Sequence, residues 1–291
     1  MLKNTRKWII IFIIPAVIIF SLFYAYPFFS VIATSMTEWR LTETPVFNGF
    51  TNYINLFKDK VFIKSLGNVA KWLVLSWTIY VGLGVLIALL TRKQNKFNKF
   101  VKVTYLIPNM ISIAALAMTF YFIFQPSFGV VNSVIRGLGF TDFSQNWYFQ
   151  YNTAFSTVTL TTILFAGLIT ILVASEISAV PDSVMESAKV DGAKEWQVNV
   201  YIILPMIKNI IGTSLILATV QVLKVFEVIF LTTGGGPGSQ TMNLSVYLYN
   251  NALKENNFGY ANAIGTMIII IGVVSIIAIN KILKMESSHY L

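Results

Sequence analysis

The sequence predicts an all-α integral membrane protein with about six transmembrane helices, forming a single domain over residues 1–291. Composition is the first reason: 56% of the residues are apolar and 11% are charged, whereas a soluble domain has about 25% charged residues. The second reason is the length of the apolar runs, which suits membrane crossing. The third is their continuity, because the strands of a membrane barrel alternate polar and apolar residues over segments of about 10.

Six apolar stretches have about the 20 residues that a helix needs to cross the hydrocarbon core. The predicted spans lie near 8–30, 69–90, 103–125, 154–175, 209–231 and 260–280. The first stretch exceeds the roughly 7–15 apolar residues of a secretory signal, and no small-residue cleavage site clearly follows it. We therefore expect it to be retained as a helix, which Pro15 and Pro27 can bend.

Basic residues predict the orientation, because cytoplasmic loops are richer in Lys and Arg. One set of segments holds thirteen of them: Lys3, Arg6, Lys7, Arg92, Lys93, Lys96, Lys99, Lys102, Lys189, Lys194, Lys208, Lys281 and Lys284. The opposite set holds seven: Arg40, Lys58, Lys60, Lys64, Lys71, Arg136 and Lys254. Both termini and the segment 176–208 are therefore expected in the cytoplasm. The same bias accounts for the net charge of +9 without any nucleic-acid partner.

Several function classes are disfavoured by missing motifs. The chain has no Cys, so it offers neither disulfide nor thiolate chemistry. Neither H-E-x-x-H nor G-x-S-x-G occurs, and the one histidine, His289, cannot by itself form a catalytic or metal site. The glycines of 231–241 lack the Lys of a phosphate-binding loop. We expect neither enzyme activity, nor a bound metal or cofactor, nor an ATPase site within this chain.

Three segments on the outer side have structural and functional interpretations. Residues 37–68 place aromatic and apolar side chains at helical spacing, which predicts a helix on the membrane surface. Residues 126–151 either close an external mouth or simply pack. The stretch LTTGGGPGSQT at 231–241 predicts a tight turn with positive φ angles. A plain turn is the simpler interpretation, and an outer gate formed by Gly234, Gly235, Gly236 and Pro237 is the functional one.

The segment ESAKVDGAKEWQVNVYIILP at 186–205 is typical of a soluble helical protein, although apolar runs flank it. Ser183 and Glu186 have the spacing of a capping box, and Gly192 can end the helix that starts there. The result is a cytoplasmic helix of about two turns. A second amphipathic helix is predicted from Lys194 toward Leu204, with Pro205 marking a change of direction into the fifth span. On these residues alone, a solvated hairpin and a docking helix are equally favoured.

This segment resembles the cytoplasmic signature loop of ATP-binding-cassette (ABC) importer permeases, which runs Glu-Ala-Ala, three residues, Gly, nine residues, Ile-x-Leu-Pro. Here Glu186-Ser187-Ala188, Gly192 and Ile202-Ile203-Leu204-Pro205 keep every spacing, with Ser187 as the one departure. Asp191-Gly192-Ala193 is similar to the carbohydrate-uptake (maltose and glycerol-phosphate type) version. Supporting matches are YPFF at 26–29, FNGFTNYINLF at 47–57, LIP at 106–108, GVVN at 129–132 and TTGGGP at 232–237.

The resemblance implies a type I ABC importer fold with a coupling helix between the fourth and fifth helices. It implies a second permease subunit in a heterodimer, a cytoplasmic ATPase dimer that binds ATP and Mg, and an extracytoplasmic solute-binding protein. It also implies that the chain moves a sugar, such as a di- or oligosaccharide, by alternating access. The residues expected to couple to the ATPase are Glu186, Ser187, Ala188, Asp191, Gly192, Ala193, Leu204 and Pro205.

A solute path is predicted in the fifth span, because ionisable residues inside a bilayer usually face a cavity or each other. Lys224 and Glu227 are expected one helical turn apart on the same face, with Gln221 one turn further along. An ion pair that only eases insertion is the alternative and is equally favoured. For a sugar, Phe226 and Trp77 are the aromatics expected to stack on the ring.

Other transport classes remain as alternatives. A secondary transporter or channel that works alone is one, although the chain shows no convincing internal repeat of the kind such folds often have. An ABC exporter is another, but it would need longer cytoplasmic helix extensions or a fused ATPase. A glycerol phosphate ester is the alternative substrate. Absence of Cys and frequent Lys, Asn and Ile indicate a bacterium, so the expected location is a bacterial plasma membrane.

Overall fold

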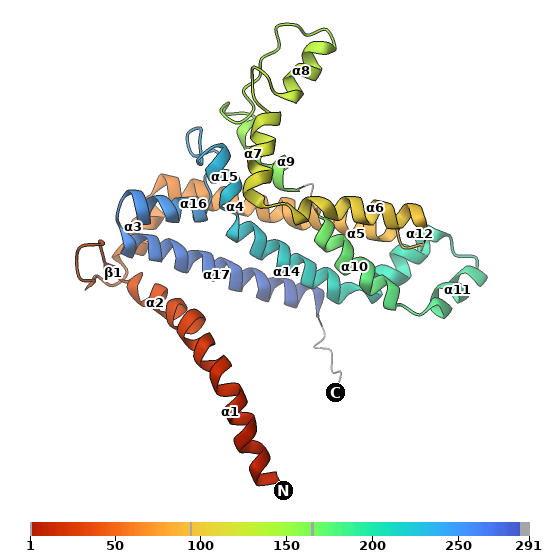
Figure 1. The fold of residues 1–291 in the computed structure, drawn as a ribbon, viewed down its shortest axis with the longest axis horizontal. Coiled ribbons are helices and arrows are strands. Elements are labelled where there is room, and N and C mark those ends of the chain that lie inside the picture. The colour runs from red at the N-terminus through yellow and green to blue at the C-terminus, as the bar shows by residue number, and fades with distance from the viewer. Residues whose placement is uncertain (1, 94, 164–165, 286–291) are drawn as a thin grey trace. The chain divides into compact units, whose positions relative to one another are not determined.

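The computed structural model describes residues 2–93, 95–163 and 166–285, and nearly all of its regular structure is helical (Figure 1). The fold class predicted from composition is confirmed. The chain divides into two compact units: one combines Met1–Ile63 with Tyr247–Ile269, and the other combines Lys64–Val246 with Ile270–Leu291. His289 and positions 164–165 of the fourth predicted span lie outside the described residues.

The first unit contains a two-stranded antiparallel ladder among helices. Its elements are α1 (Leu2–Phe20), a π-helical segment (Ser21–Ala25), α2 (Tyr26–Thr34), β1 (Thr37–Glu38), β2 (Val46–Phe47), α3 (Thr51–Lys58), the start of α4 (Lys60–Leu75), the end of α16 (Leu244–Tyr249), a second π-helical segment (Asn250–Lys254) and the first part of α17 (Phe258–Leu283). In the ladder, Thr37 pairs with Phe47 and Glu38 with Val46.

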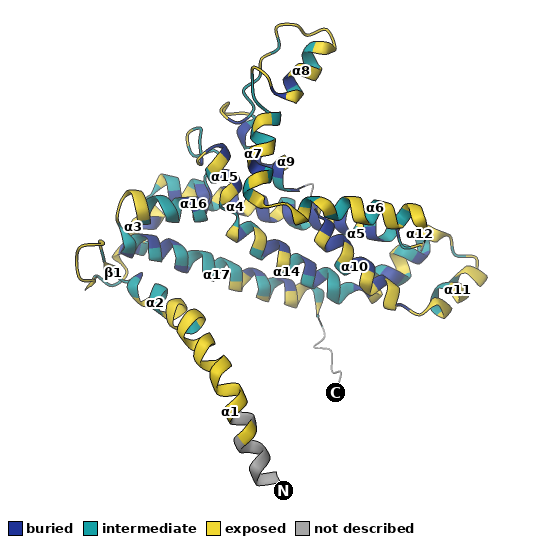
Figure 2. Cartoon of the chain, in the orientation of Figure 1, coloured by how far each residue is buried: buried dark blue, intermediate teal, exposed yellow. Residues whose placement is uncertain are grey.

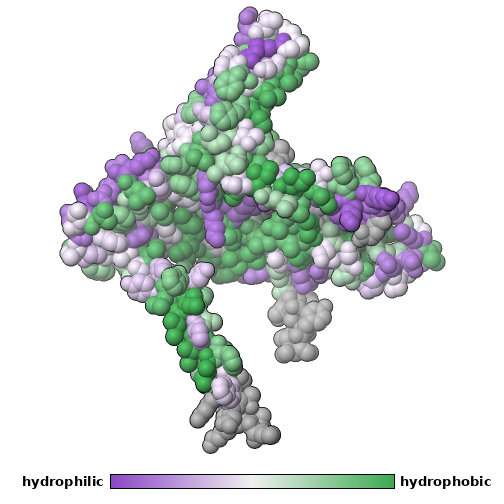
Figure 3. Space-filling model, in the orientation of Figure 1, coloured by the Kyte–Doolittle hydropathy of each residue, from purple (hydrophilic) through white to green (hydrophobic). Residues whose placement is uncertain are grey.

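Exposed apolar side chains cover α1 over its described part from Ile11 to Phe20 (Figures 2 and 3). The end of α1, the π-helical segment and α2 form one helical run of 24 residues, Ile11–Thr34. No residue of the most apolar 18-residue stretch in this run is buried. A helix that is apolar all round is stable in lipid or against another apolar surface rather than in water. The π-helical segment ends two residues before Pro27, whose missing N–H leaves the Phe23 carbonyl within that segment without its regular α-helical donor.

The number of membrane-crossing helices agrees with the prediction when bent helices are counted as single spans. Four helical runs are long and apolar enough: Ile11–Thr34, Lys60–Leu90, Lys208–Thr232 and Phe258–Leu283. Two bent pairs bring the total among the described residues to as many as six: Lys96–Met110 with Ile113–Ile123, bent by 97°, and Ala154–Ile163 with Gly167–Ala179, bent by 40°.

The third predicted span, 103–125, is not a straight helix. Pro108 lies in a short 3-10 helix (Ile107–Met110), and Ile111 and Ser112 then adopt extended ψ angles of 142° and 133°. Proline removes a backbone donor and cannot continue regular helical bonding. The 97° bend follows at this point.

The stretch 37–68, predicted to lie on the outer side, does form the expected helix, α3, but its apolar residues divide between buried and exposed positions. Phe50 and Phe57 are exposed, whereas Leu56 is fully buried. The Tyr53 hydroxyl lies 2.6 Å from the Ser35 hydroxyl. Leu56 therefore packs inside its own unit, and the position of α3 on the membrane surface stays a prediction.

Asp59 joins three parts of the first unit. One carboxylate oxygen, Oδ1, accepts the Val61 N–H at 2.7 Å at the start of α4. The other, Oδ2, accepts the hydroxyls of Tyr247 and Tyr260, the latter at 2.9 Å. Partial burial raises the pKa of Asp59, but these hydrogen bonds outweigh it, so the net pKa lies below the usual value.

We expect Asp59→Asn to lower the free energy of unfolding at neutral pH by about 1–2 kcal/mol, because the tyrosine hydroxyls lose a charged acceptor. The folded-state pKa is depressed, so this contribution is present above the unfolded pKa of about 4 and is lost as the pH falls through the folded value. Thermal unfolding of the purified chain at pH 7 and in acid measures it. The exposed Asp142→Asn is the control. If Asp59→Asn lowered the free energy of unfolding as much in acid as at pH 7, this account would be contradicted.

The second unit holds the rest of α4, α16 and α17 and all the elements between α4 and α16. These are a π-helical segment (Ser76–Tyr80), α5 (Val81–Leu90), α6 (Lys96–Leu106), the 3-10 helix, α7 (Ile113–Ile123), α8 (Val130–Gly137), α9 (Ala154–Ile163), α10 (Gly167–Ala179), α11 (Asp182–Val190), α12 (Glu195–Gln197), a π-helical segment (Val198–Ile203), α13 (Leu204–Met206), α14 (Lys208–Lys224) and α15 (Glu227–Thr232).

Close packing of α5 on α10 forms the centre of this unit. A Cβ placed on Gly84 of α5 would lie 2.7 Å from the Ile169 side chain of α10, so only glycine permits this approach. Small residues allow such close contact between membrane helices, where the attraction comes from van der Waals packing. Around the contact lies a core that includes Val81, Ala88, Val173 and Ile177.

The loop 126–151, which the sequence predicted on the outer side, is held by its own polar contacts. Asn132 is fully buried, and its Nδ2 donates to the carbonyls of Pro126 at 3.0 Å and Gln145 at 2.8 Å. Its Oδ1 accepts the Trp147 Nε1–H at 2.8 Å. These bonds explain the fold of the loop without a gating role, which favours the packing interpretation.

Candidate functional site

The helix predicted within the segment 182–205 is present as α11. It begins at Asp182, one residue before the predicted capping residue Ser183, and Pro181 occupies the N-cap position without a side-chain cap bond. The capping-box prediction was therefore wrong. The physical reason is that Pro181 fixes the backbone entering the helix, while Asp182 places a negative charge in the first turn, where the helix dipole favours it.

The predicted C-terminal cap at Gly192 is confirmed. Gly192 has φ +82°, a conformation that L side chains rarely adopt. Its N–H donates to the Lys189 carbonyl at 3.0 Å, and the Ala193 N–H donates to the Ala188 carbonyl at 2.9 Å. This bond pair is a Schellman motif, which satisfies the last carbonyls and stops the helix after Val190.

Two faces of α11 have different surroundings. Met185 and Ala188 pack against the core to which α5 and α10 contribute, and Ala193 packs there as well. Glu186, Ser187, Val190 and Asp191 are exposed, Val190 to 87%. The predicted coupling residues therefore separate into an outer face and an inner face, with Ala188 and Ala193 on the inner one.

The segment after Gly192 is helical from Glu195 to Met206, but not regularly α-helical. Its start is capped by the Gln197 side chain, whose Oε1 accepts the Lys194 N–H at 2.7 Å. A π-helical segment then precedes Pro205, which lacks a backbone donor. Pro205 is exposed, Leu204 packs on the core, and α14 begins three residues after Pro205.

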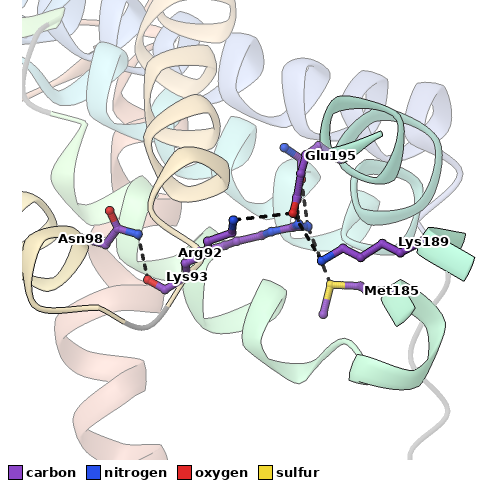
Figure 4. Close-up of polar contacts among 7 residues, drawn as sticks. Arg92, Lys93, Asn98, Met185, Lys189 and Glu195 are labelled. Carbon is purple, nitrogen blue, oxygen red and sulfur yellow. Dashed lines mark hydrogen bonds and ion pairs between the residues drawn. The ribbon is translucent and has the colours of Figure 1, made fainter. Parts of the chain in front are cut away.

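Glu195 lies at the centre of an ion cluster that sequence patterns did not reveal (Figure 4). Its carboxylate is paired with the Arg92 guanidinium, and its Oε1 lies 3.3 Å from Lys189 Nζ and 3.6 Å from Lys93 Nζ. Arg92 also donates to Asn199 Oδ1 at 3.0 Å. Slight burial raises the pKa of Glu195, but the Lys189 hydrogen bond and the charges of Arg92, Lys189 and Lys93 together lower it below its usual value.

A cavity of about 350 Å³ lies within the second unit. All three residues of the predicted solute path, Gln221, Lys224 and Glu227, line it. Its polar lining also includes Ser76, Tyr80, Asn109, Thr159, Thr161 and Thr162, and its apolar lining includes Trp72, Ile111, Leu116, Val158 and Ile229. Size and lining match sites for small organic molecules, which combine an apolar wall with a few polar groups.

The fifth predicted span is interrupted between two of these residues. Lys224 ends α14, Val225 is extended with ψ 120°, and Glu227 begins α15. The prediction that Lys224 and Glu227 are one turn apart on one helix face was therefore wrong. The freed carbonyls find side-chain donors instead: Asn243 Nδ2 to Val225 at 2.6 Å, and Ser245 Oγ to Leu223 at 2.7 Å.

The interruption changes how each charge is stabilised. Lys224 lies in the last turn of α14 and Glu227 in the first turn of α15, where the helix dipoles favour a cation and an anion respectively. The ion pairs found among the described residues do not include one between Lys224 and Glu227. Both side chains are exposed to the cavity side rather than buried against each other.

The aromatic side chains that line the cavity, Trp72 and Tyr80, differ from those predicted. Trp77 packs in the core beside α5, where its indole donates to Thr219 Oγ1 at 2.9 Å. Phe226 stacks on Phe230. Trp72 lines the cavity instead, positioned by a 2.9 Å bond to Thr159 Oγ1 and by stacking on Phe155. Four residues beyond Trp72, Ser76 also reaches the cavity.

The turn that follows α15 has the positive φ angles that its glycines predicted. They occur at Gly234, Gly235 and Gly238, and a Cβ on Gly235 would collide with Met242. The buried Asn68 amide donates to the carbonyls of Ser239 at 3.1 Å and Met242 at 2.9 Å. The turn is thus a well-bonded structure, and its role as an outer gate stays a prediction.

Several site residues escaped the sequence patterns. The threonines of 157–162 were a usable signal, since Thr159, Thr161 and Thr162 recur within an apolar span and line the cavity. Asn109 was another, because it is a polar residue just after Pro108. By contrast, nothing local pointed to Arg92 as a partner of Glu195, because the two are 103 positions apart.

Comparison with known proteins gives consistent relatives. Residues 80–285 match the family of the binding-protein-dependent transport system inner membrane component. The multiple sugar-binding transport system permease protein MsmF of Streptococcus mutans is 32% identical, with 97% of each chain covered. The probable ABC transporter permease protein YurN of Bacillus subtilis is 30% identical, with 90% of each covered.

Among solved structures, a bacterial ABC transporter involved in the import of the acidic polysaccharide alginate contains a similar chain. The TM-score is 0.84 at 25% identity, and the match covers 98% of each chain. The fold is therefore that of an ABC importer permease, as the 186–205 segment predicted. The chain belongs to the family of binding-protein-dependent transport system inner membrane components, and it is a transport subunit of the ABC permease class.

Proposed function

We propose that this chain moves a di- or oligosaccharide inward across a bacterial plasma membrane by alternating access, driven by a separate ATPase that docks on α11. The exposed outer face of α11 is the observation that supports the coupling role. A capped helix with Met185 and Ala188 packed on the core transmits force stiffly, which alternating access requires. Glu186, Ser187 and Asp191 then contact the ATPase, and Gly192 leaves room for it.

The sugar assignment rests on the cavity. Gln221 and Asn109 offer amide groups that match the donors and acceptors of a sugar, and Trp72 offers an aromatic face. MsmF is described as part of a multiple sugar-binding system, and the alginate transporter imports a polysaccharide. Both charged residues, Lys224 and Glu227, are placed to bond hydroxyls as well.

The proposed assembly contains a second permease subunit, a cytoplasmic ATPase dimer that holds ATP and Mg, and an extracytoplasmic solute-binding protein. A related crystal structure contains an alginate ABC transporter with an oligosaccharide-bound periplasmic protein. In this proposal both termini and α11 lie in the cytoplasm, which the positive-inside pattern supports. The turn at 234–237 then lies on the outer side, where it would meet the binding protein or close the path.

Affinity purification of the tagged chain from its native membrane, followed by mass spectrometry, tests this proposal. We expect a second six-helix permease and a nucleotide-binding ATPase to co-purify. Recovery of the folded chain alone, reproducibly, would instead support an autonomous transporter or channel. Uptake assays with a panel of oligosaccharides and glycerol phosphate esters then separate the two substrate classes.

A further inference from the structure

The backbone does not connect α11 rigidly to its neighbours. Val180 and Pro181 are extended before it, with ψ angles of 126° and 131°, so helical bonding does not continue from α10 into α11. After it, Gly192 turns the chain with φ +82°. Side chains must therefore set the direction of α11. The packing of Met185 and Ala188 is one such attachment.

The ion cluster at Glu195 is the second attachment. It joins Lys189, in the last turn of α11, to Arg92 and Lys93, which directly follow α5. Arg92 is the most buried member of this cluster: its side chain is only 11% exposed, against 50% for Glu195. The Arg92 guanidinium also reaches Asn199 and lies 3.8 Å from Met185 Sδ on the inner face of α11.

We propose that Glu195 is a positioning residue that ties the coupling helix α11 to the cytoplasmic end of α5. This rests on the proposed docking function of α11. Isolated exposed ion pairs contribute little, but here one carboxylate is shared by three cations from two segments, and one of those cations is nearly buried. Displacement of α11 is then transmitted to α5, and through the Gly84 contact to α10.

Distance measurements between spin labels test the tie directly. The chain has no Cys, so Ser183→Cys on α11 and Leu90→Cys at the end of α5 give one unique label pair, and both positions are exposed. In the purified complex, double electron–electron resonance should show a single narrow distance. We expect Glu195→Gln and Arg92→Gln each to raise, by about fivefold, the fraction of molecules whose label distance falls outside this narrow peak. Each variant removes the same network of ion pairs.

Three further variants make the test specific. The double variant should broaden the distances no more than either single one, because both act through one contact. Glu195→Asp should restore part of the narrow distribution. Glu176→Gln, an exposed glutamate on α10, should leave it unchanged. Narrow distances in folded Glu195→Gln would overturn the inference.

Co-purification separates this inference from the proposed function. If the unsubstituted chain retains no ATPase, the docking proposal fails, while the label distances still decide whether Glu195 positions α11. If Glu195→Gln loses the ATPase but keeps narrow distances, Glu195 belongs to the docking surface itself and the tie is excluded. We expect Glu195→Gln to retain the ATPase, because the outer face of α11 is unchanged.

Discussion

Gly192→Trp is expected to reduce ATP-driven uptake to background while the protein still inserts into the membrane in normal amount. A Cβ at position 192 meets no atom of the chain within 4 Å, so the indole has space in the isolated chain. The positive φ adds strain of about 1–2 kcal/mol, which the packing of α11 can absorb. We therefore expect uptake to be lost because the indole ring occupies the surface that is proposed to bind the ATPase.

Gly192→Asn is the matched control for that experiment. Asparagine tolerates positive φ and is small, so it separates strain from bulk. We expect it to retain most of the uptake and the co-purifying ATPase, whereas Gly192→Trp loses both. Membrane amount and elution of the detergent-solubilised chain report folding. Normal uptake by Gly192→Trp would exclude a close contact at this position.

Glu227→Gln is expected to lower transport by about tenfold or more without changing the amount of protein, because a hydrogen bond to a charged group contributes about 1.5–3 kcal/mol. Glu227 lines the cavity at the start of α15, beyond the interruption at Val225. Its stabilisation by the helix dipole does not require Lys224, so neutralising it should not disturb insertion. Uptake of the sugar identified in the panel assay measures the effect.

Glu43→Gln, an exposed position between β1 and β2, is the control for loss of a carboxylate. The double variant Lys224→Gln/Glu227→Gln tests the alternative in which the two residues serve only as an ion pair for insertion. In that case each single variant would lower the amount of protein and the double variant would restore it. Unchanged transport by Glu227→Gln would remove this residue from the proposed path.

Local sequence patterns predicted much of the helical structure. Runs such as 209–231 and 260–280 correspond to α14 with α15 and to α17, because a helix in lipid must satisfy its own backbone and needs a fixed apolar length. Gly192 was equally predictable, since only glycine readily adopts the conformation that ends α11. These features depend on residues close together in the chain.

Interruptions inside the spans were harder to predict. Val225 carries no helix-breaking signal, and its extended conformation is stabilised by Asn243, which lies 18 positions away. Pro108 did indicate a disturbance, but not a bend of 97°. A break in an apolar helix is tolerated only where other side chains satisfy the freed backbone groups, and a local pattern does not show which ones do so.

The sequence by itself determined the fold class, the membrane location and the family, because composition, run length and the spacing from Glu186 to Pro205 are local properties. Only the tertiary structure decided which face of α11 is exposed, which tryptophan lines the cavity, and which cations surround Glu195. Each of these depends on contacts between segments far apart in the chain, such as Trp72 with Thr159 and Arg92 with Glu195. Periodicity places a side chain on a helix face, but packing decides what that face meets.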